Sequence, residues 1–382
     1  MPFPLAIVCI ALLSAAIAIH LLSVALVLWR LRDVSGADPI ADPPALTVLR
    51  PVCGLEPGLE EALRSTFTSL TSSYEAIFCI ANPTDPAVAL VRSVMASYPA
   101  VPARLLIGDD RISGNPKLNN LAKGWLAARH DWIVMIDSNV LLPRDYMQIL
   151  FASWTKGIGL VTSPPAGICA QGLWASVEAG FLNTYQARWQ LATDQIGNGF
   201  AQGKVLMWQR ALLEKAGGIG SLGLEMAEDV ASTKVVRAAK LKVRVVRRPF
   251  PQPLFQRTAA EVWSRQLRWA RVRRAGFPLL FALEPLTFAV LPVGAIAAMA
   301  YLGAVPAATA AAYVALWYGA EWALARRADW PASLGQIPAW MLRDALMPLI
   351  WLSSFASRHF VWRGNAMVGG AAQLQAAARK QI

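Results

Sequence analysis

The chain has 382 residues, of which 55% are hydrophobic and only 16% are charged, and its net charge is +12. Ordinary soluble domains carry roughly 25% charged residues, so this composition excludes a wholly soluble protein. A positive surface on so apolar a chain indicates anionic lipid or phosphate as a partner, and no nucleic acid. The four cysteines show neither zinc-site nor disulfide spacing.

The N-terminal region begins with an apolar run. Residues 3–29 contain no charged side chain, and the run ends at Arg30 and Arg32. About 20 apolar residues cross a bilayer, whereas a cleavable signal peptide begins with basic residues and is shorter. We therefore predict a retained transmembrane anchor over residues 1–32, with its basic end in the cytosol. A linker rich in Asp and Pro is predicted over residues 33–45.

The pattern then changes to short apolar runs separated by stretches with helical spacing. Buried strands are predicted at 46–51, 76–81, 104–107 and 132–137, and helices at 56–68, 87–97 and 118–129. This alternation predicts an α/β domain with a mostly parallel, doubly wound sheet over residues 46–276. In such sheets ligands bind beyond the carboxyl ends of the strands.

Apolar sequence returns after residue 276. Transmembrane spans are predicted at 277–305 and 307–324, and the basic pair Arg326 and Arg327 then returns the chain to the cytosol.

The next apolar segment, 337–355, carries Arg343 and Asp344. Charges are costly at bilayer depth, so this segment is predicted to lie in the interface or to re-enter. Residues 277–356 are thus predicted to engage the membrane, and residues 357–382 to form a C-terminal tail.

Three carboxylates are candidates for chemistry. Asp85 follows the second predicted strand, Asp137 follows the fourth, and Asp229 lies at the start of a later helical stretch. An Asp at a strand end can bind a divalent cation that neutralises a diphosphate, and a later carboxylate can serve as general base. Each also has a structural interpretation: a turn residue for Asp85, a loop or cap residue for Asp137, and a helix-start charge for Asp229.

Lys117 lies in a Gly- and Pro-containing turn, residues 113–120, just before a helix. Such a turn offers N–H groups and an ammonium to an anion, or is simply solvated. The stretch 197–203, with Gln202 and Trp208, is a candidate for the sugar or acceptor pocket, or a flexible loop.

A strongly basic run precedes the second apolar region. Between Lys240 and Arg274 the only acid is Glu261. A cytosolic flank explains much of this charge. It does not explain why Arg265 and Arg268 stand three residues apart, a spacing that places two guanidinium groups on one helix face where they can grip a phosphate, with Trp269 beside them.

The order of these motifs resembles a known family. Asp85, Asp137, Asp229 and Arg265-x-x-Arg-Trp269 resemble the D, D, D, (Q/R)xxRW pattern of processive and lipid-directed GT-A glycosyltransferases. Asn115-Pro-Lys-Leu-Asn-Asn120, Leu49-Arg-Pro-Val-Cys-Gly54 and Ala227-Glu-Asp229 look like ceramide glucosyltransferases of glycosyltransferase family 21, bacterial branch.

The resemblance implies an inverting GT-A (Rossmann-like) enzyme that uses a UDP-sugar, commonly with Mg²⁺ or Mn²⁺. It implies that Asp229 is the base, and that the nucleotide, diphosphate and acceptor are held by Asp85, Lys117, Asp137, Arg265, Arg268 and Trp269. Asp137 would bind the metal, and Asn139 would offer a neutral oxygen where many GT-A enzymes have a second Asp. The expected location is the bacterial inner membrane, multi-pass, with the catalytic domain in the cytosol.

Several alternatives stay open at this point. Glucose and ceramide are the first choices of sugar and acceptor, and a hopanoid acceptor is the second. A processive polysaccharide synthase shares the motif set but generally needs more membrane segments. A transporter should show polar sites on several spans in repeated halves, and no repeat is visible.

Overall fold

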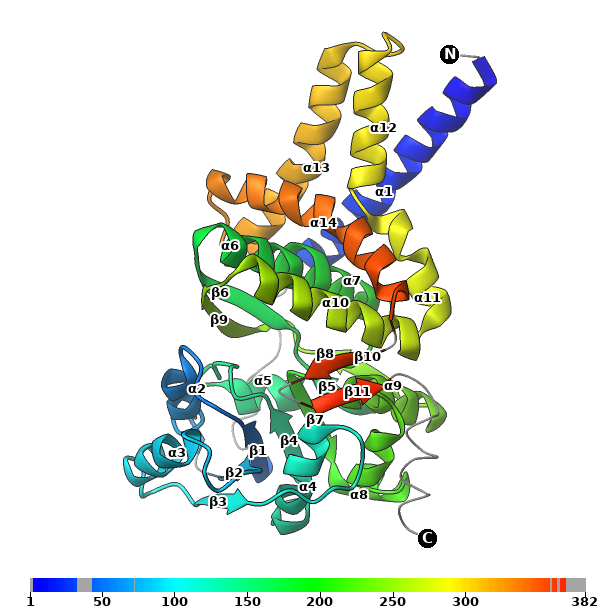
Figure 1. Ribbon diagram of the computed structural model, residues 1–382. Coiled ribbons are helices and arrows are strands. Elements are labelled where there is room, and N and C mark those ends of the chain that lie inside the picture. The colour runs from blue at the N-terminus through cyan, green and yellow to red at the C-terminus, as the bar shows by residue number, and fades with distance from the viewer. Residues whose placement is uncertain (1–2, 33–42, 72, 358, 363–364, 369–382) are drawn as a thin grey trace.

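The computed structural model describes residues 3–32, 43–71, 73–357, 359–362 and 365–368 (Figure 1). Most of the predicted linker and C-terminal tail therefore lies outside the described residues. The described residues form an α/β body from which a group of apolar helices projects, and a layer of helices lies between the two (Figure 1).

The body is built on a seven-stranded sheet with the order β3-β2-β1-β4-β7-β5-β8. The strands are β1 Leu46–Val52, β2 Tyr74–Ile80, β3 Ala103–Ile107, β4 Trp132–Ile136, β5 Ile158–Thr162, β7 Val205–Gln209 and β8 Lys242–Val245. The predicted mostly parallel sheet is confirmed. β3 was predicted as a buried strand, and this is wrong, because β3 forms an edge of the sheet and its residues are half-buried or exposed.

Strand β7 runs antiparallel to both of its neighbours, β4 and β5. Its first residue, Val205, therefore pairs with the last residue of β4, Ile136. The amino end of β7 thus lies at the same edge of the sheet as the carboxyl ends of β1, β2 and β4. This edge is where ligands bind in doubly wound sheets.

Helices cover both faces of the sheet. Side chains of β4 alternate, so that Ile133 and Met135 pack with α4 residues and Val134 and Ile136 pack with α5 residues. The helices of the body are α2 Leu59–Ser65, α3 Ala87–Ala96, α4 Pro116–Ala127, α5 Tyr146–Ala152, α8 Arg210–Lys215, the 3₁₀ helix η2 Ile219–Leu224 and α9 Glu228–Ala238.

A middle layer joins the body to the apolar helices (Figure 1). It contains a parallel pair of strands, β6 Pro165–Gln171 and β9 Phe250–Gln256. It also contains α6 Gly172–Gly180, the π-helix η1 Phe181–Ala187, α7 Arg188–Gln195, α10 Ala259–Gly276 and α14 Ile337–Phe355. A short antiparallel pair, β10 His359–Trp362 and β11 Asn365–Val368, follows α14.

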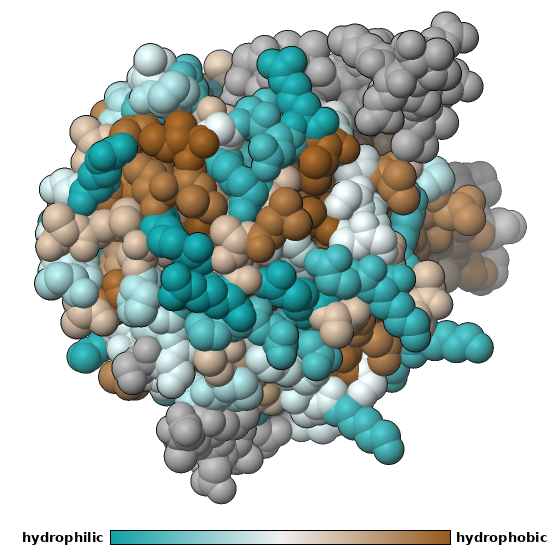
Figure 2. Space-filling model, turned by 90° about the horizontal axis from the view of Figure 1, so that it is seen from below, coloured by the Kyte–Doolittle hydropathy of each residue, from teal (hydrophilic) through white to brown (hydrophobic). Residues whose placement is uncertain are grey.

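The projecting helices are α1 Phe3–Arg32, α12 Val290–Tyr301 and α13 Ala307–Arg327 (Figure 1). Large apolar side chains such as Leu12, Leu291 and Leu302 are exposed there. The opposite end of the molecule is covered largely by hydrophilic residues with scattered apolar patches (Figure 2). Two described helical segments are long and apolar enough to cross a membrane by length and composition, Ile7–Arg32 and Pro278–Tyr301.

The predicted span 277–305 is not one straight helix. It consists of α11 Pro278–Leu283, the 3₁₀ helix η3 Glu284–Thr287 and α12, and Phe288 between η3 and α12 has extended backbone angles. Its Phe281 and Phe288 side chains are buried against α14. The bend falls at Glu284 and Pro285, a charged residue and a helix-breaking proline within an otherwise apolar run.

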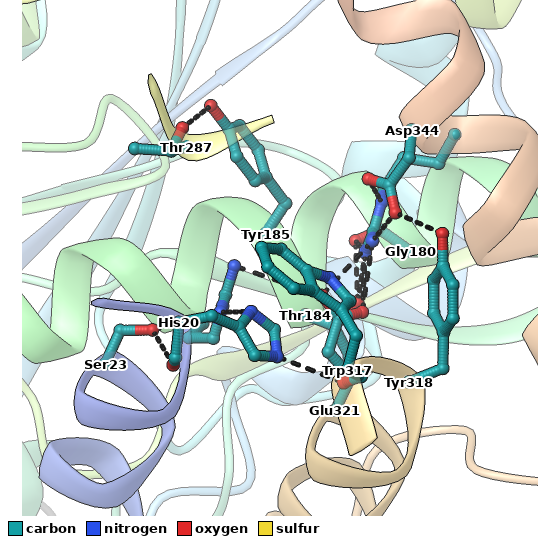
Figure 3. A network of polar contacts seen from close by, with 12 residues as sticks. His20, Ser23, Gly180, Thr184, Tyr185, Thr287, Trp317, Tyr318, Glu321 and Asp344 are labelled. Carbon is teal, nitrogen blue, oxygen red and sulfur yellow. Dashed lines mark hydrogen bonds and ion pairs between the residues drawn. The ribbon is translucent and has the colours of Figure 1, made fainter. Parts of the chain in front are cut away.

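The charges of α14 lie inside the protein. Arg343 pairs with Asp344 at 2.8 Å and with Glu321 of α13 at 3.0 Å. Arg188 of α7 lies 3.9 Å from Glu321 and 2.8 Å from Nδ1 of His20 in α1. This network, shown in Figure 3, joins α1, α7, α13 and α14, so the charges in 337–355 and the polar His20 are mutually paired rather than exposed to lipid.

Candidate active site

Asp85 lies at the sheet edge just beyond β2. The backbone N–H of Gly54, which follows β1, donates to both carboxylate oxygens of Asp85 at 3.0 and 2.9 Å. The N–H of Ala87, at the start of α3, donates to Oδ1 at 2.8 Å. Gly54 has φ +69°, which favours glycine. These bonds hold the Asp85 side chain at the predicted edge, where the residue is partly exposed.

Arg50 fixes the loop that carries Asp137. Its side chain is fully buried and donates to the carbonyl oxygens of Asp137 at 2.9 Å and Val140 at 2.7 Å, and to Oγ1 of Thr66 at 2.7 Å. Burial lowers the pKa of Arg50 to about 10, which leaves it charged at neutral pH. The Arg-Pro-Val-Cys-Gly motif therefore has a structural reason: its arginine organises the loop after β4.

Lys117 lies at the centre of the site. Its Nζ atom lies 2.6 Å from Oδ1 of Asp137 and 2.7 Å from Oε1 of Glu228, and donates to the carbonyl of Gly203 at 2.5 Å. Asn115 caps α4 by accepting from the Lys117 N–H, and its Nδ2 donates to Oε2 of Glu228 at 2.8 Å. The Lys117 ammonium therefore binds carboxylates of this chain. One of the predicted alternatives was that it lies in an open turn and faces a bound anion.

A second lysine completes the group. Nζ of Lys204, just before β7, lies 3.1 Å from Oδ2 of Asp137 and 3.0 Å from Oδ1 of Asn139. Although burial opposes it, the ammonium groups of Lys117 and Lys204 hold the pKa of Asp137 well below its usual range. Burial lowers the pKa of Lys204, Asp137 opposes this, and the nearby Arg265 charge adds to the lowering.

Asp137 and Asn139 were predicted as metal ligands. Among the described residues no group of three or more His, Cys, Asp and Glu side chains could hold a metal ion. Mg²⁺ and Mn²⁺ prefer several oxygen ligands with negative charge among them. Here one carboxylate and one amide are present, and both already accept from Lys204. The residues in this arrangement do not fit a divalent ion held by the protein.

Asp229 is the second residue of α9 and faces the same group. Its Oδ2 accepts from the Gly203 N–H at 3.0 Å, and its side chain is only partly buried. Burial and the neighbouring Glu228 charge raise the pKa of Asp229 to about 6, against the opposing effects of Gly203 and Lys117. A carboxylate with its pKa near neutrality is suited to accept a proton and to release it again.

The basic helix α10 reaches this edge through Arg265. Nη1 of Arg265 lies 2.7 Å from Oε1 of Glu178 in α6, and Nε of Arg257 lies 3.2 Å from Oε2 of the same residue. Glu178 is fully buried, so it orients both arginines. Trp269 packs on the apolar cluster of Ala179, Leu182 and Leu254. The structure places Arg268 on the same helix.

Three residues of the site were absent from the sequence analysis: Lys204, Glu178 and, as a partner of Lys117, Glu228. Glu178 had no signal, because it lies in an apolar helix far from the motifs. Lys204 directly follows the Gly197–Gly203 stretch, so it could have been noticed. The prediction that Trp208 lines a pocket is wrong, since its indole is fully buried in the core beside Trp125.

The chain is similar to known proteins along most of its length. The family model of glycosyl transferase family 21 matches residues 13–370, which include the apolar helices as well as the sheet. The chain belongs to glycosyl transferase family 21. This glycosyltransferase is 27% identical over 363 residues to ceramide glucosyltransferase 1 of Caenorhabditis elegans, across 92% of this chain and 77% of that protein. It is 39% identical over 99 residues to the ceramide glucosyltransferase of Komagataella phaffii, across 25% of this chain and 19% of that protein.

The glycosyltransferase also resembles a solved structure. A mannosyltransferase from Pyrobaculum calidifontis, in complex with GDP-Man and Mn²⁺, matches it with a TM-score of 0.50 and 19% identity, covering 91% of this chain and 97% of that chain. This likeness shows the fold. The predicted GT-A fold and glycosyltransferase family 21 are confirmed, and the bacterial branch stays a prediction.

Proposed function

We propose that this family 21 glycosyltransferase moves glucose from UDP-glucose to the primary hydroxyl of ceramide, with inversion, at the cytosolic face of a membrane. The carrying observation is Asp229, a partly exposed carboxylate with a pKa near neutrality at the carboxyl edge of the sheet. The choice of ceramide and glucose is supported by relatives that are named ceramide glucosyltransferases.

In this mechanism Asp229 accepts the proton of the acceptor hydroxyl. The hydroxyl oxygen forms a bond to the anomeric carbon as the bond to the diphosphate breaks, and the proton stays on Asp229 until product leaves. Attack opposite the leaving group in one displacement inverts the anomeric centre. With a pKa near 6, most of the Asp229 carboxyl is ionised at neutral pH and can accept this proton.

Positive groups of the chain would stabilise the departing diphosphate. Arg265 is oriented by the buried Glu178, and Arg268 lies three residues later on α10. Asp85 and Asp137 would contact the nucleotide at the ends of β2 and β4. Lys117 would hold Asp137 and Glu228 in place beneath the donor. Fixed charges of this kind stabilise developing charge because they need no reorganisation during reaction.

The acceptor would arrive from the side of the apolar helices. α10 lies in the layer between the sheet and α1, α12 and α13 (Figure 1). The basic ends of α1 and α13 meet there, since Arg327 donates to the Leu31 carbonyl at 2.8 Å. Basic residues favour the cytosolic side. We propose residues 46–276 as the catalytic domain and 277–356 as the C-terminal membrane part.

The test uses membranes from a host that lacks glycolipids and expresses either wild type or Asp229→Asn. Each is incubated with a panel of UDP-sugars and with ceramide or a hopanoid, and the lipids are analysed by mass spectrometry. A hexosylceramide made by wild type alone supports the proposal. A glycosylated hopanoid would replace the acceptor, and equal product from both proteins would remove Asp229 from the mechanism.

A further inference from the structure

The ammonium of Lys204 stands where two motif side chains converge. Asp137 and Asn139 are two residues apart in the loop after β4, and both present an oxygen to the same Nζ atom, at 3.1 and 3.0 Å. The Lys204 side chain is 11% exposed, so its position is defined by these contacts and by the surrounding protein.

The backbone makes this placement rigid. The N–H of Asp137 donates to the carbonyl of Lys204 at 3.0 Å, in continuation of the β4–β7 pairing. Lys204 therefore lies directly before β7, an antiparallel strand that is mostly buried in the sheet. The strand pairing thus sets the position of the Lys204 backbone, and the contacts with Asp137 and Asn139 set the position of its ammonium.

The oxygens of Asp137 and Asn139 form a poor donor set for a divalent ion, and both contact the Lys204 ammonium. Asp137 supplies the only negative charge of the pair, and its other oxygen lies 2.6 Å from Lys117. Asn139 supplies a neutral oxygen. Two ammonium groups, of Lys117 and Lys204, contact this carboxylate, and Glu228 is itself bound to Lys117, so a divalent ion at Asp137 and Asn139 would meet two repelling charges at close range.

We propose that Lys204 takes the place of a divalent metal ion in this enzyme and binds the diphosphate of the donor directly. This rests on the proposed function, because it requires a nucleoside diphosphate donor at the sheet edge. An ammonium supplies three hydrogen-bond donors and a point charge, which suits phosphate oxygens. Arg265 is close enough to Lys204 for the two charges to repel, and it would contact the same diphosphate from α10.

The experiment measures binding rather than turnover. Purified wild type, Lys204→Met and the control Lys215→Met, an exposed lysine at the end of α8, are titrated with UDP by calorimetry, first with EDTA and then with Mn²⁺. Bound Mn²⁺ is measured separately by electron paramagnetic resonance. We expect wild type and Lys215→Met to bind UDP equally well in both media and to retain no Mn²⁺.

Lys204→Met should bind UDP about tenfold or more weakly in EDTA, since a charged hydrogen bond is lost. Circular dichroism checks its fold, and Lys204→Arg, which keeps the charge, should bind UDP without metal. The double variant Lys204→Met/Asn139→Asp, with two carboxylates in the loop after β4 and without the Lys204 ammonium, should acquire Mn²⁺ binding.

Two results would overturn the proposal while leaving the proposed function intact: tighter UDP binding by wild type with Mn²⁺ than with EDTA, accompanied by bound Mn²⁺, or unchanged UDP binding by Lys204→Met in EDTA. If wild type bound UDP in neither medium, the donor in the proposed function would itself be wrong, and this proposal would fall with it.

Discussion

Nζ of Lys117 lies 2.7 Å from Oε1 of Glu228, although 111 residues separate the two in the chain. Both side chains are at least nine-tenths buried. This ion pair joins the start of α4 to the start of α9 and places Asp229, the neighbour of Glu228, at the sheet edge. The geometry of the proposed base therefore depends on a lysine far from it in sequence.

Replacing Lys117 by Met should destabilise the protein strongly. The change leaves Glu228 and Asp137 without their shared cation, and removal of one partner from a buried ion pair costs about 3–5 kcal/mol. The thermal midpoint of unfolding in detergent measures the effect. Lys215→Met, at an exposed position, should leave the midpoint unchanged, and equal midpoints for the two variants would contradict the role given to Lys117.

The transfer rate should depend on pH through Asp229. Its pKa is raised to about 6, so the carboxyl is protonated below that pH and cannot accept a proton. We expect kcat/KM to fall about tenfold per pH unit below the pKa and to level off above it. Glu228→Gln removes a charge that raises this pKa and should move the acid limb to lower pH. An unmoved limb would mean that another group controls it.

Gly203→Ala should reduce activity while the protein stays folded. A Cβ atom at Gly203 would lie 2.8 Å from Oε1 of Glu228, so this carboxylate would have to shift beside Asp229, whose Oδ2 would lie 3.4 Å from the same Cβ. Even a small displacement of a catalytic group lowers the rate of the reaction. Gly220→Ala is the matched control, because a Cβ there meets no atom within 4 Å. Similar kcat values for both variants would argue against a tight carboxylate arrangement.

Glu178→Gln should weaken donor binding, although the Glu178 side chain does not itself contact the donor. The change removes the anion that orients Arg257 and Arg265, and Glu178 is fully buried. We expect a loss of about 3–5 kcal/mol in stability and a raised KM for the nucleotide sugar. Glu60→Gln, which removes an exposed i,i+4 pair with Arg64, should cost under about 1 kcal/mol. An unchanged KM in Glu178→Gln would separate Arg265 from the donor.

Arg343→Met should loosen the apolar helices from the catalytic body. Arg343 pairs with Glu321 and Asp344 in the network of Figure 3, where all three side chains are buried. Removal of its charge leaves two buried carboxylates, so we expect a fall in stability of about 3–5 kcal/mol. Limited proteolysis should then cut between α10 and α14 more rapidly than in wild type. Arg64→Met, at an exposed position, is the control.

Much of the fold follows from local sequence. The apolar run of α1, the alternation that produces β1, β2 and β4, and the Asn-Pro-Lys cap of α4 each depend on residues that are neighbours in the chain. Hydrophobic period and turn chemistry act over such short distances, so they predict these elements and the edge where Asp85, Asp137 and Asp229 gather. Taken as a set and in their order along the chain, the motifs also predict the family.

What the tertiary structure decided concerns direction and pairing. Only the antiparallel course of β7 brings Lys204 to Asp137 and Asn139. Similarly, Glu178 pairs with Arg265 only because α6 and α10 pack together in the structure. The bend at Phe288 likewise depends on how the helices around it pack. A strand's apolar pattern is the same whichever way it runs, and a buried charge finds its partner only when distant elements pack. The sequence therefore determined the elements and the chemistry, and packing decided which charges face one another.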